Sequence, residues 1–474
     1  MVSLLIKIIV FLFALGGMIF LHELGHFIAA RWAKIEVEEF GFGLPPRAFG
    51  FWRKKGYFVL NGERVEIPVN FDLKLDWTFL QQKFVSISAD KVEDKLILCS
   101  LKYTDTQQTS SENPRNAQEI SVNRDGKPAA PDGNMVSKTL SFGKEQGAIQ
   151  MEGRFSEIHS GTLFSINWLP FGGFIRPKGE NDPTIPGGLA SANPWKRLVV
   201  LVAGPLMNLL TAVIVFSVLV GLEGIPVPGS VKIGSVAENS PAQQADIQAG
   251  DILLAVNGES ITDIQPAIDI IKSNLDKPVE LLIERNGEKI TITATPLSSR
   301  KKEEGALGIG LTYPTRAATF TEITAGGVMI TGVQAATLLY IPVAIVQGVI
   351  APEDARVVGF KGIFDMFNIA VEEDVSTRQE AAAAPAGAPA PEPTNLTLSL
   401  IGLLSISLGV MNLLPIPALD GGRILFTLPE ILFHRRIPPE RENMVNGIAM
   451  LMLIALLLFV NVMDFINPVQ IPVP

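Results

Sequence analysis

Long apolar segments and polar, strand-like stretches alternate along the chain. The apolar segments lie within residues 1–34, 196–222, 395–423 and 444–474. At about 1.5 Å of rise per residue, a helix of about 20 apolar residues is long enough to cross the hydrocarbon core of a bilayer. The pattern therefore predicts four transmembrane helices.

The polar stretches between these helices predict β structure. Aromatic residues and glycines alternate within residues 35–56 and again within residues 162–195, which favours short membrane-associated strands. Such strands, with Gly172 and Gly173 among their residues, would offer an open edge to an extended peptide. Aromatic packing and turns are the alternative interpretation of both stretches. Residues 57–161 carry short alternating runs and predict a β-rich insertion.

Residues 225–300 predict a separate soluble module. Short apolar strands flank an amphipathic helix near Ile264–Asn274, and Asn286-Gly287 is a strong hairpin turn between the last two strands. The module resembles a PDZ domain of the bacterial protease type, a fold that can bind peptides by strand addition. Ala245-Asp246-Ile247 replaces the Ala-Gly-Leu usual in that family, and no obvious carboxylate-binding loop precedes the first strand. A steric or docking role is therefore as consistent with the sequence as binding of a free C-terminus.

Composition and charge narrow the class of protein. The chain has 474 residues, of which 47% are hydrophobic, and its net charge is −9. Its mean hydropathy of +0.31 is too high for an ordinary soluble protein and indicates a membrane protein with soluble insertions. The acidic balance gives no electrostatic basis for nucleic-acid binding. The single cysteine, Cys99, excludes an internal disulfide and a multi-cysteine zinc site.

Basic residues indicate the orientation of the helices. They cluster directly after the first apolar segment and again within residues 424–443, a predicted loop. By the positive-inside rule both segments are cytoplasmic. The insertion at 57–161 is then cytoplasmic as well, and the module at 225–300 lies outside the cytoplasm.

The first apolar segment carries the candidate chemistry. His22, Glu23 and His26 form an H-E-x-x-H pattern, which in a helix puts both histidines on one face, where they can bind one metal ion. Glu23 lies beside them as a general base. Polar residues inside an apolar span are costly to bury and therefore mark a function, although a pair of buried, hydrogen-bonded histidines is the alternative. In the second apolar segment, Ala203-Gly204-Pro205 permits close helix packing or a kink, and Asn208 is expected to hydrogen-bond across helices.

A catalytic zinc ion needs three protein ligands and an open position for water. Asp420 is the best third candidate, because it is a lone acid at the end of an apolar helix beside two glycines. A helix-end or turn aspartate is the alternative. Asn412, Pro415 and Pro417 lie just before it and would line the cleft, where the Asn412 amide would hold a substrate backbone in extended form.

Residues 301–370 follow the module and contain an uncharged segment, 325–350, that is long enough to cross the membrane. Asp420 and the two histidines each lie towards the end of their own helix, so both helices must cross in the same direction to bring them together. An odd number of crossings then separates them, and residues 196–222 supply one. We therefore predict that 325–350 lies on the membrane surface. Residues 371–394 are rich in Ala and Pro and predict an exposed linker.

These motifs together resemble the bacterial branch of the site-two protease family, of the regulator of sigma-E protease type. The resemblance rests on the H-E-x-x-H pattern, on Asn412 to Pro417 followed by Leu419-Asp420-Gly421, and on the PDZ-like module; Gly179-Glu180 and Asn208 also fit. It implies a zinc protease in the cell inner or plasma membrane that cleaves a single-pass membrane protein, often an anti-sigma factor. It also implies an upstream first-site protease and a PDZ domain that filters substrates. The insertion at 57–161 is far longer than is usual in the family.

Two other functions are consistent with parts of the pattern. A non-proteolytic membrane PDZ adaptor would hold a purely structural metal, and such a site has no need of Glu23. A metal transporter would need more intramembrane acids and histidines than the sequence provides. The sequence therefore predicts an α-helical membrane protein with four transmembrane helices, a membrane-associated β-hairpin region, a cytoplasmic β-rich insertion and one extracytoplasmic PDZ domain (α+β). Its active site would lie towards the cytoplasmic side.

Overall fold

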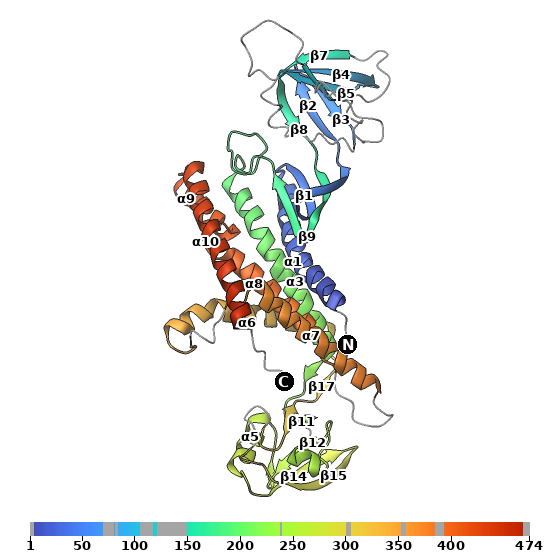
Figure 1. Cartoon of the computed structure of the whole chain (residues 1–474), viewed down its shortest axis with the longest axis vertical. Coiled ribbons are helices and arrows are strands. Elements are labelled where there is room, and N and C mark those ends of the chain that lie inside the picture. Colours follow the sequence, from blue (N-terminus) through green and yellow to red (C-terminus); the bar gives the residue numbers. More distant parts are fainter. Residues whose placement is uncertain are drawn as a thin grey trace. The chain divides into compact units, whose positions relative to one another are not determined.

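The computed structural model describes most of the chain, and Figure 1 labels its elements. The described residues are 4–69, 80, 84–104, 117–120, 149–237, 239–299, 305–351, 357–383 and 393–467. The chain divides into two compact units. The first comprises Leu12–Asn208 and Met411–Met452, and the second comprises Met1–Phe11, Leu209–Val410 and Leu453–Pro474.

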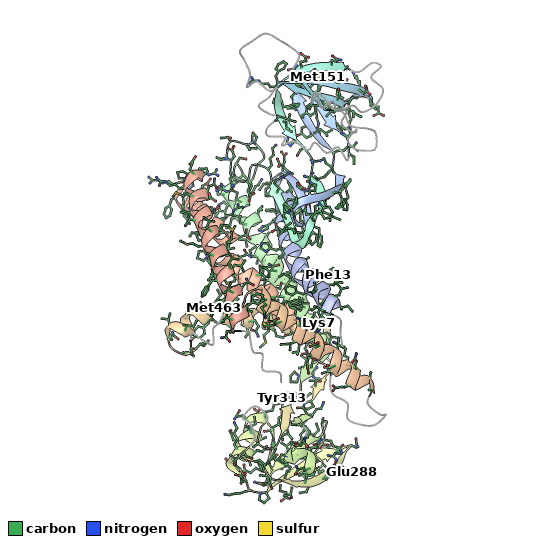
Figure 2. All side chains as sticks on the ribbon, viewed as in Figure 1. Lys7, Phe13, Met151, Glu288, Tyr313 and Met463 are labelled. Carbon is green, nitrogen blue, oxygen red and sulfur yellow. The ribbon has the colours of Figure 1, made fainter. Side chains whose placement is uncertain are left out.

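Five helices in the described ranges are long and apolar enough to cross a membrane: α1 Leu4–Ala33, α3 Pro194–Glu223, α6 Phe320–Val346, α8 Leu396–Leu413 and α10 Pro439–Ile466. Their large apolar side chains point outward; Phe13 of α1, for example, is 80% exposed (Figure 2). Leaving apolar surface in water costs about 25 cal/mol per Å², so these helices are suited to lipid. The helix α6 covers residues 325–346 of the segment 325–350, whose position on the membrane surface stays a prediction.

The stretches expected to be membrane-associated strands pair with each other in the first unit. β1 (Val37–Arg53) and β9 (Leu163–Pro177) are antiparallel, and each folds back so that it contributes two runs to the sheet. The run 37–42 of β1 lies between the runs 163–166 and 173–177 of β9, since Phe40 pairs with both Phe164 and Ile175. The run 173–177 is therefore at the edge of this sheet.

Glycines allow the sheet to lie directly on α1. A Cβ atom on Gly172 would be 2.4 Å from Ile19, and one on Gly173 would be 3.1 Å from the ring of Phe20. Phe27 of α1 also stacks on Phe40, with 4.7 Å between the ring centroids. These contacts fix the edge run of β9 against the helix that carries the H-E-x-x-H pattern.

The insertion at 57–161 has a β-sheet of its own. Its strands are ordered β7-β4-β5-β3-β2-β8, with β6 paired to β5. Their bounds are β2 Gly56–Leu60, β3 Glu63–Ile67, β4 Phe84–Val92, β5 Lys95–Thr104, β6 Ala117–Ile120, β7 Ile149–Gly153 and β8 Phe155–His159. Fully buried Phe58, Leu60 and Leu98 belong to its apolar core. The β-rich character predicted for this insertion is thus observed.

The soluble module in the second unit is built on the sheet β15-β14-β12-β11-β16. Its elements are β10 Ile225–Pro226, β11 Val231–Val236, α4 Pro241–Gln244, β12 Ile252–Val256, β13 Glu259–Ser260, α5 Ile264–Ser273, β14 Val279–Arg285, β15 Glu288–Ala294, β16 Ile309–Thr312 and β17 Thr315–Arg316. The expected boundary at residue 300 is too early, because β16 completes the sheet beside β11. The short pair of β10 and β17 then joins the two ends of the module.

A buried ion pair stabilises the module. Asp251, 2% exposed, accepts hydrogen bonds from Nε and Nη2 of Arg285 at 2.7 and 2.8 Å, and from the backbone of Gln248 at 2.9 Å. Asp251→Ala is expected to destabilise the module by about 3 kcal/mol, because it leaves the Arg285 charge without this partner. Hydrogen exchange of the β12 and β14 amides in the full-length protein measures the loss. Asp269→Ala removes an exposed carboxylate and is expected to change exchange little; equal protection in both variants would contradict the prediction.

The helix α7 (Phe360–Ala383) corrects the linker prediction. Residues 371–383 are helical, and only the part from 384 to 392 lies outside the described residues. The carboxylate of buried Asp374 accepts hydrogen bonds from the backbone N–H groups of Leu396 and Thr397 at 2.8 and 3.0 Å. It thereby caps the N-terminus of α8, a contact that an Ala/Pro composition does not reveal.

The third apolar segment is also divided differently from the prediction. The helix α8 ends at Leu413, and Asp420 is the first residue of α9 (Asp420–Phe433) instead of the last residue of a spanning helix. Pro415 and Pro417 explain the break, because proline has no N–H to continue a helix. Most of the loop expected at 424–443 is accordingly helical, in α9 and the start of α10.

Candidate metal centre

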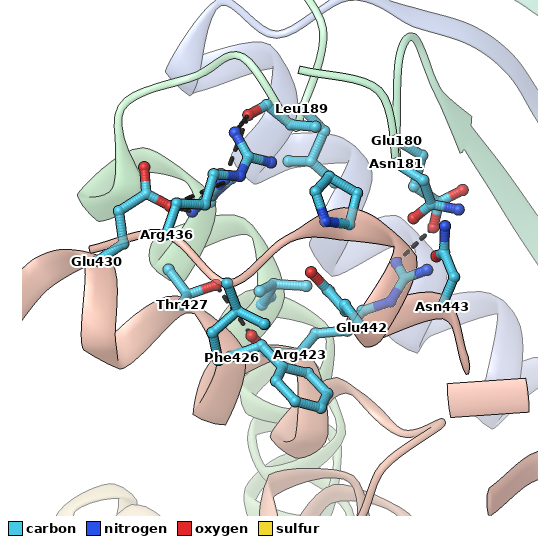
Figure 3. A pocket seen from close by; sticks show the side chains of 15 residues that line it. Glu180, Asn181, Leu189, Arg423, Phe426, Thr427, Glu430, Arg436, Glu442 and Asn443 are labelled. Atoms are coloured by element: carbon cyan, nitrogen blue, oxygen red, sulfur yellow. Dashed lines mark hydrogen bonds and ion pairs between the residues drawn. The ribbon is translucent and has the colours of Figure 1, made fainter. Parts of the chain in front are cut away.

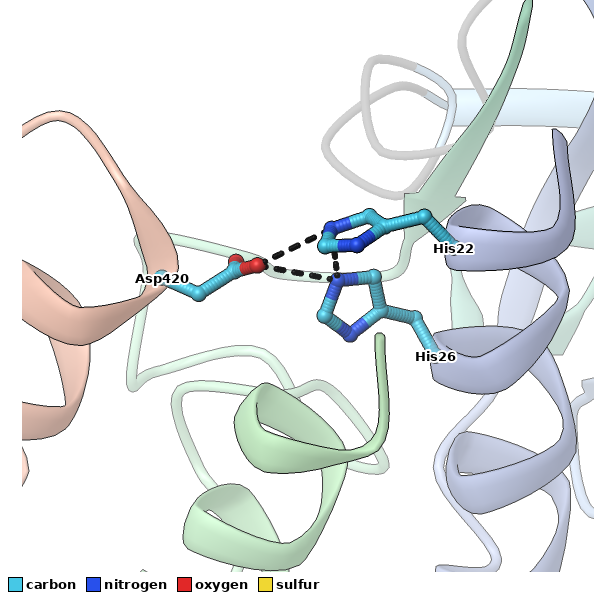
Figure 4. A group of neighbouring side chains, drawn as sticks. All are labelled: His22, His26 and Asp420. Atoms are coloured by element: carbon cyan, nitrogen blue, oxygen red, sulfur yellow. Dashed lines mark hydrogen bonds and ion pairs between the residues drawn. The ribbon is translucent and has the colours of Figure 1, made fainter. Parts of the chain in front are cut away.

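Three side chains from two helices of the first unit converge on one point. His22 and His26 are one turn apart on α1, and their Nε2 atoms are 3.1 Å apart. Oδ2 of Asp420 lies 3.0 Å from Nε2 of His22 and 3.3 Å from Nε2 of His26 (Figure 4). Two imidazole nitrogens and a carboxylate oxygen are donors that suit Zn²⁺, and three ligands leave a fourth position open.

The helix α3 orients both imidazole rings. Nδ1 of His26 lies 2.7 Å from the carbonyl oxygen of Val200, to which it donates a hydrogen bond. This bond leaves Nε2 of His26 free of its proton and directed at the centre. The side-chain amide of Asn208 lies 3.0 Å from Nδ1 of His22, so the cross-helix hydrogen bond predicted for Asn208 is confirmed.

Glycines bring α1 and α3 close enough for these bonds. A Cβ atom on Gly25 would be 2.4 Å from the carbonyl oxygen of Ala203, and a Cβ atom on Gly204 would be 2.3 Å from Nε2 of His26. Gly204 therefore leaves the room that the His26 ring occupies. The sequence indicated close packing or a kink at Ala203-Gly204-Pro205, but not the residue that Gly204 contacts.

Gly204→Ala is expected to weaken metal binding by at least about tenfold, because the added methyl group overlaps Nε2 of His26, a candidate ligand atom. The measurement is the zinc affinity of the purified protein. Gly17→Ala is the matched control, since a Cβ at Gly17 in α1 meets no atom within 4 Å. Equal zinc affinity in the two variants would show that the His26 ring does not need this space.

A tight turn places Asp420. The backbone of Ala418 has φ +74° and its N–H donates to Oδ1 of Asn446 at 3.0 Å. A Cβ atom on Gly421 would be 1.9 Å from the carbonyl oxygen of Leu414, so only glycine fits after the aspartate. Asp420 is thus fixed at the start of α9.

The three side chains line a cavity of about 330 Å³. Glu23 and Asn412 line the same cavity, as do Phe174 and Ile175 from the edge run of β9. The cavity therefore holds a candidate base, a candidate metal site and a strand edge together.

The other residues predicted to bind substrate lie elsewhere. Pro415 and Pro417 form the break between α8 and α9, and Gly172 and Gly173 pack on α1; none of the four is among the residues that line the cavity. Sequence reasoning missed Arg423, which lines it one turn after Asp420. Glu180 lines it too, and its only signal in the sequence was the Gly179-Glu180 step of a family pattern.

The chain matches known proteins over most of its length. The sequence profile of peptidase family M50 matches residues 10–61 and 148–456. Zinc metalloprotease RasP of Bacillus licheniformis is 28% identical over 96% of this chain and 98% of its own length. Regulator of sigma-W protease RasP of Bacillus subtilis is 25% identical over 96% of this chain and 97% of its own length. A putative zinc metalloprotease of Clostridium perfringens is 30% identical over 71% of this chain and 93% of its own length.

Two solved structures resemble part of the chain. The PDZ domain of an SdrC-like protein from Listeria monocytogenes is 24% identical and covers 19% of this chain and 92% of the solved chain, with a TM-score of 0.17. The PDZ domain of the corresponding protein from Listeria innocua is 25% identical and covers 19% and 99%, with a TM-score of 0.16. The family profile includes both the H-E-x-x-H helix and the start of α9. The chain belongs to peptidase family M50 and is a metalloendopeptidase.

Proposed function

We propose that this protein is a zinc-dependent intramembrane endopeptidase, with His22, His26 and Asp420 as the metal ligands. The observation that carries the proposal is the convergence of these three side chains in a cavity that also contains Glu23. Their donor atoms all lie within 4.8 Å of one another. Zinc bound there would act as a Lewis acid on the scissile carbonyl and on water.

Glu23 is the catalytic base in this proposal. It takes a proton from the attacking water and then delivers that proton to the nitrogen of the leaving amine, so that the C–N bond breaks without a free amide anion. The new C–O bond leaves a carboxyl group on one product and an amine on the other. The alternative function, a PDZ adaptor with a structural metal, gives no role to a glutamate in this position.

The edge of the β1–β9 sheet binds the substrate. The run 173–177 has one neighbouring run in the sheet, the run 37–42 of β1, and its residues Phe174 and Ile175 line the metal cavity. A transmembrane helix hides its peptide bonds in its own hydrogen bonds, so the cleaved segment must first unwind. The unwound segment would then add to this edge as a strand, with Asn412 holding its backbone from the opposite side. Gly172 and Gly173 keep the edge in place, and Pro415 and Pro417 shape the approach.

The substrate is a single-pass membrane protein of regulatory function, such as an anti-sigma factor. The name of the Bacillus subtilis relative, regulator of sigma-W protease, supports this class. The protein then acts in the cell inner or plasma membrane, after a first-site protease has trimmed the substrate. The cavity faces the cytoplasmic side, and the module at 225–316 lies outside the cytoplasm.

The test uses the purified full-length protein with Zn²⁺ in liposomes and a single-pass model substrate. We expect one cut inside the transmembrane segment of the substrate, located by mass spectrometry of both fragments. A metal chelator is expected to abolish that cut. Cleavage confined to the soluble part of the substrate, or cleavage that survives the chelator, would overturn the proposal.

A further inference from the structure

An ion pair that the proposed mechanism does not use lies next to the metal cavity. Glu180 follows β9, and its Oε1 contacts Nη1 of Arg423 on α9 (Figure 3). Arg423 comes three residues after Asp420, so the two side chains share the first turn of α9. The pair thus joins the helix that carries a candidate metal ligand to the segment that follows the substrate strand.

The pair stands between two cavities. Glu180, Arg423, Leu189 and Leu201 line both the metal cavity and a second cavity of about 40 Å³. The second cavity is otherwise lined mainly by residues of α9 and of the start of α10, Glu430 among them (Figure 3). Glu180 and Arg423 are therefore the charged part of the wall that the two cavities share.

Backbone hydrogen bonds join the two ends of the segment that carries Glu180. The backbone N–H of Leu189 donates to the carbonyl of Lys178 at 2.8 Å, and that of Ala190 donates to the carbonyl of Gly179 at 3.0 Å. The carbonyl oxygen of Ala190 also accepts a hydrogen bond from Arg436 at 2.7 Å. Glu180 is therefore fixed to a closed loop, and its contact with Arg423 can hold α9 in place.

We propose that Glu180 and Arg423 are positioning residues that hold Asp420 opposite His22 and His26. The inference rests on the proposed function, because it takes these three residues as zinc ligands. Metal sites tolerate deviations of only about 0.2 Å in ligand distance, so a small rotation of α9 would move the Asp420 carboxylate out of reach. Both side chains are about one-third exposed, so their ion pair contributes little to the stability of the fold. A loss of zinc affinity without a loss of stability therefore distinguishes a positioning role from a structural one.

The test is the zinc affinity of Glu180→Gln in the purified full-length protein, measured by competition with a chelating dye. We expect it to fall by about 10- to 100-fold, the usual cost of losing a residue that orients a ligand. The visible absorption spectrum of the protein loaded with Co²⁺ is expected to change as well, because it reports the geometry of the ligands. The melting temperature of the metal-free protein is expected to stay at the wild-type value.

Glu430→Gln is the matched control. It removes the carboxylate charge from another ion pair of α9, between Glu430 and Arg197 of α3. This pair lies beside the second cavity only and is more buried than the Glu180–Arg423 pair. We expect wild-type zinc affinity and an unchanged Co²⁺ spectrum. The double variant Glu180→Arg, Arg423→Glu restores the attraction with the charges exchanged and is expected to recover part of the lost affinity.

Two outcomes would overturn the positioning role, and a third would overturn the proposed function. Wild-type zinc affinity and spectrum in Glu180→Gln would overturn the positioning role. An equal loss in Glu430→Gln would also overturn it, because the effect would then be a general loosening of α9. Failure of the wild-type protein to bind zinc would instead overturn the proposed function, so the two failures are distinguishable.

Discussion

Glu23→Gln is expected to lower the rate of peptide cleavage by about 10²- to 10⁴-fold, the usual contribution of a general base. Glutamine has the shape of glutamate but cannot take a proton from water. The three side chains that line the cavity with it, His22, His26 and Asp420, are unchanged in this variant. Zinc content is therefore expected to stay at the wild-type level. The measurement pairs the turnover of a membrane-embedded substrate with the metal content of the same preparation.

The matched control for this variant is Glu380→Gln. Glu380 is exposed on α7, so the same chemical change there is expected to leave both turnover and zinc content unaltered. Turnover at the wild-type rate in Glu23→Gln would show that another group accepts the proton. Loss of zinc in that variant would show that Glu23 helps to hold the metal, which the mechanism does not include.

The sequence predicts the two histidines well because their relation is local. Residues four apart share a face of any helix, and the apolar run around them makes a helix the only element that satisfies the backbone in lipid. Asp420 was a weaker prediction that relied on a lone acid beside glycines. The predicted position of Asp420 at the end of a spanning helix was wrong. Pro415 and Pro417, which were assigned to the cleft, terminate α8 instead, so Asp420 begins a new helix.

Contacts between distant segments could not be predicted in this way. The contact of Gly204 with His26 joins residues on two helices, and a glycine in an apolar helix signals close packing without naming the partner. The double pairing of Phe40 with Phe164 and Ile175 depends on strands that fold back, which alternation of aromatics and glycines does not encode. The helical part of residues 371–394 was missed for a related reason, because its Asp374 caps a helix that begins 22 residues later.

The module at 225–316 also combines elements that local sequence patterns predict with a strand that they do not predict. Its strands, its helix α5 and its hairpin turn at Asn286-Gly287 follow from local patterns. The last strand of its main sheet, β16, was missed because it lies after a polar stretch and pairs with β11, the first long strand of the sheet. Elements with a local signal are therefore visible in the sequence, whereas elements that depend on a distant partner need the structure.

Asp420→Asn is expected to abolish stable zinc binding as well as cleavage. The asparagine has nearly the shape of the aspartate, but a neutral amide is a poor zinc ligand compared with a carboxylate. Two histidines alone would remain, and a catalytic zinc site needs three protein ligands. The expected pattern thus differs from that of Glu23→Gln, which keeps its metal. The measurement is the zinc content after purification, with turnover of the same membrane-embedded substrate.

Asn446→Ala is the control that separates the role of Asp420 as a ligand from the role of the turn before it. Asn446 accepts a hydrogen bond from the backbone of Ala418 in that turn and is not itself a candidate ligand. We expect it to weaken zinc binding without abolishing it. Full zinc content in Asp420→Asn would require a different third ligand. Within the described residues, His22, His26 and Asp420 are the one group of three or more His, Cys, Asp or Glu side chains close enough to share an ion. Such a ligand would therefore have to come from a rearranged site or from another part of the chain, and the proposed arrangement of α1 and α9 would be wrong.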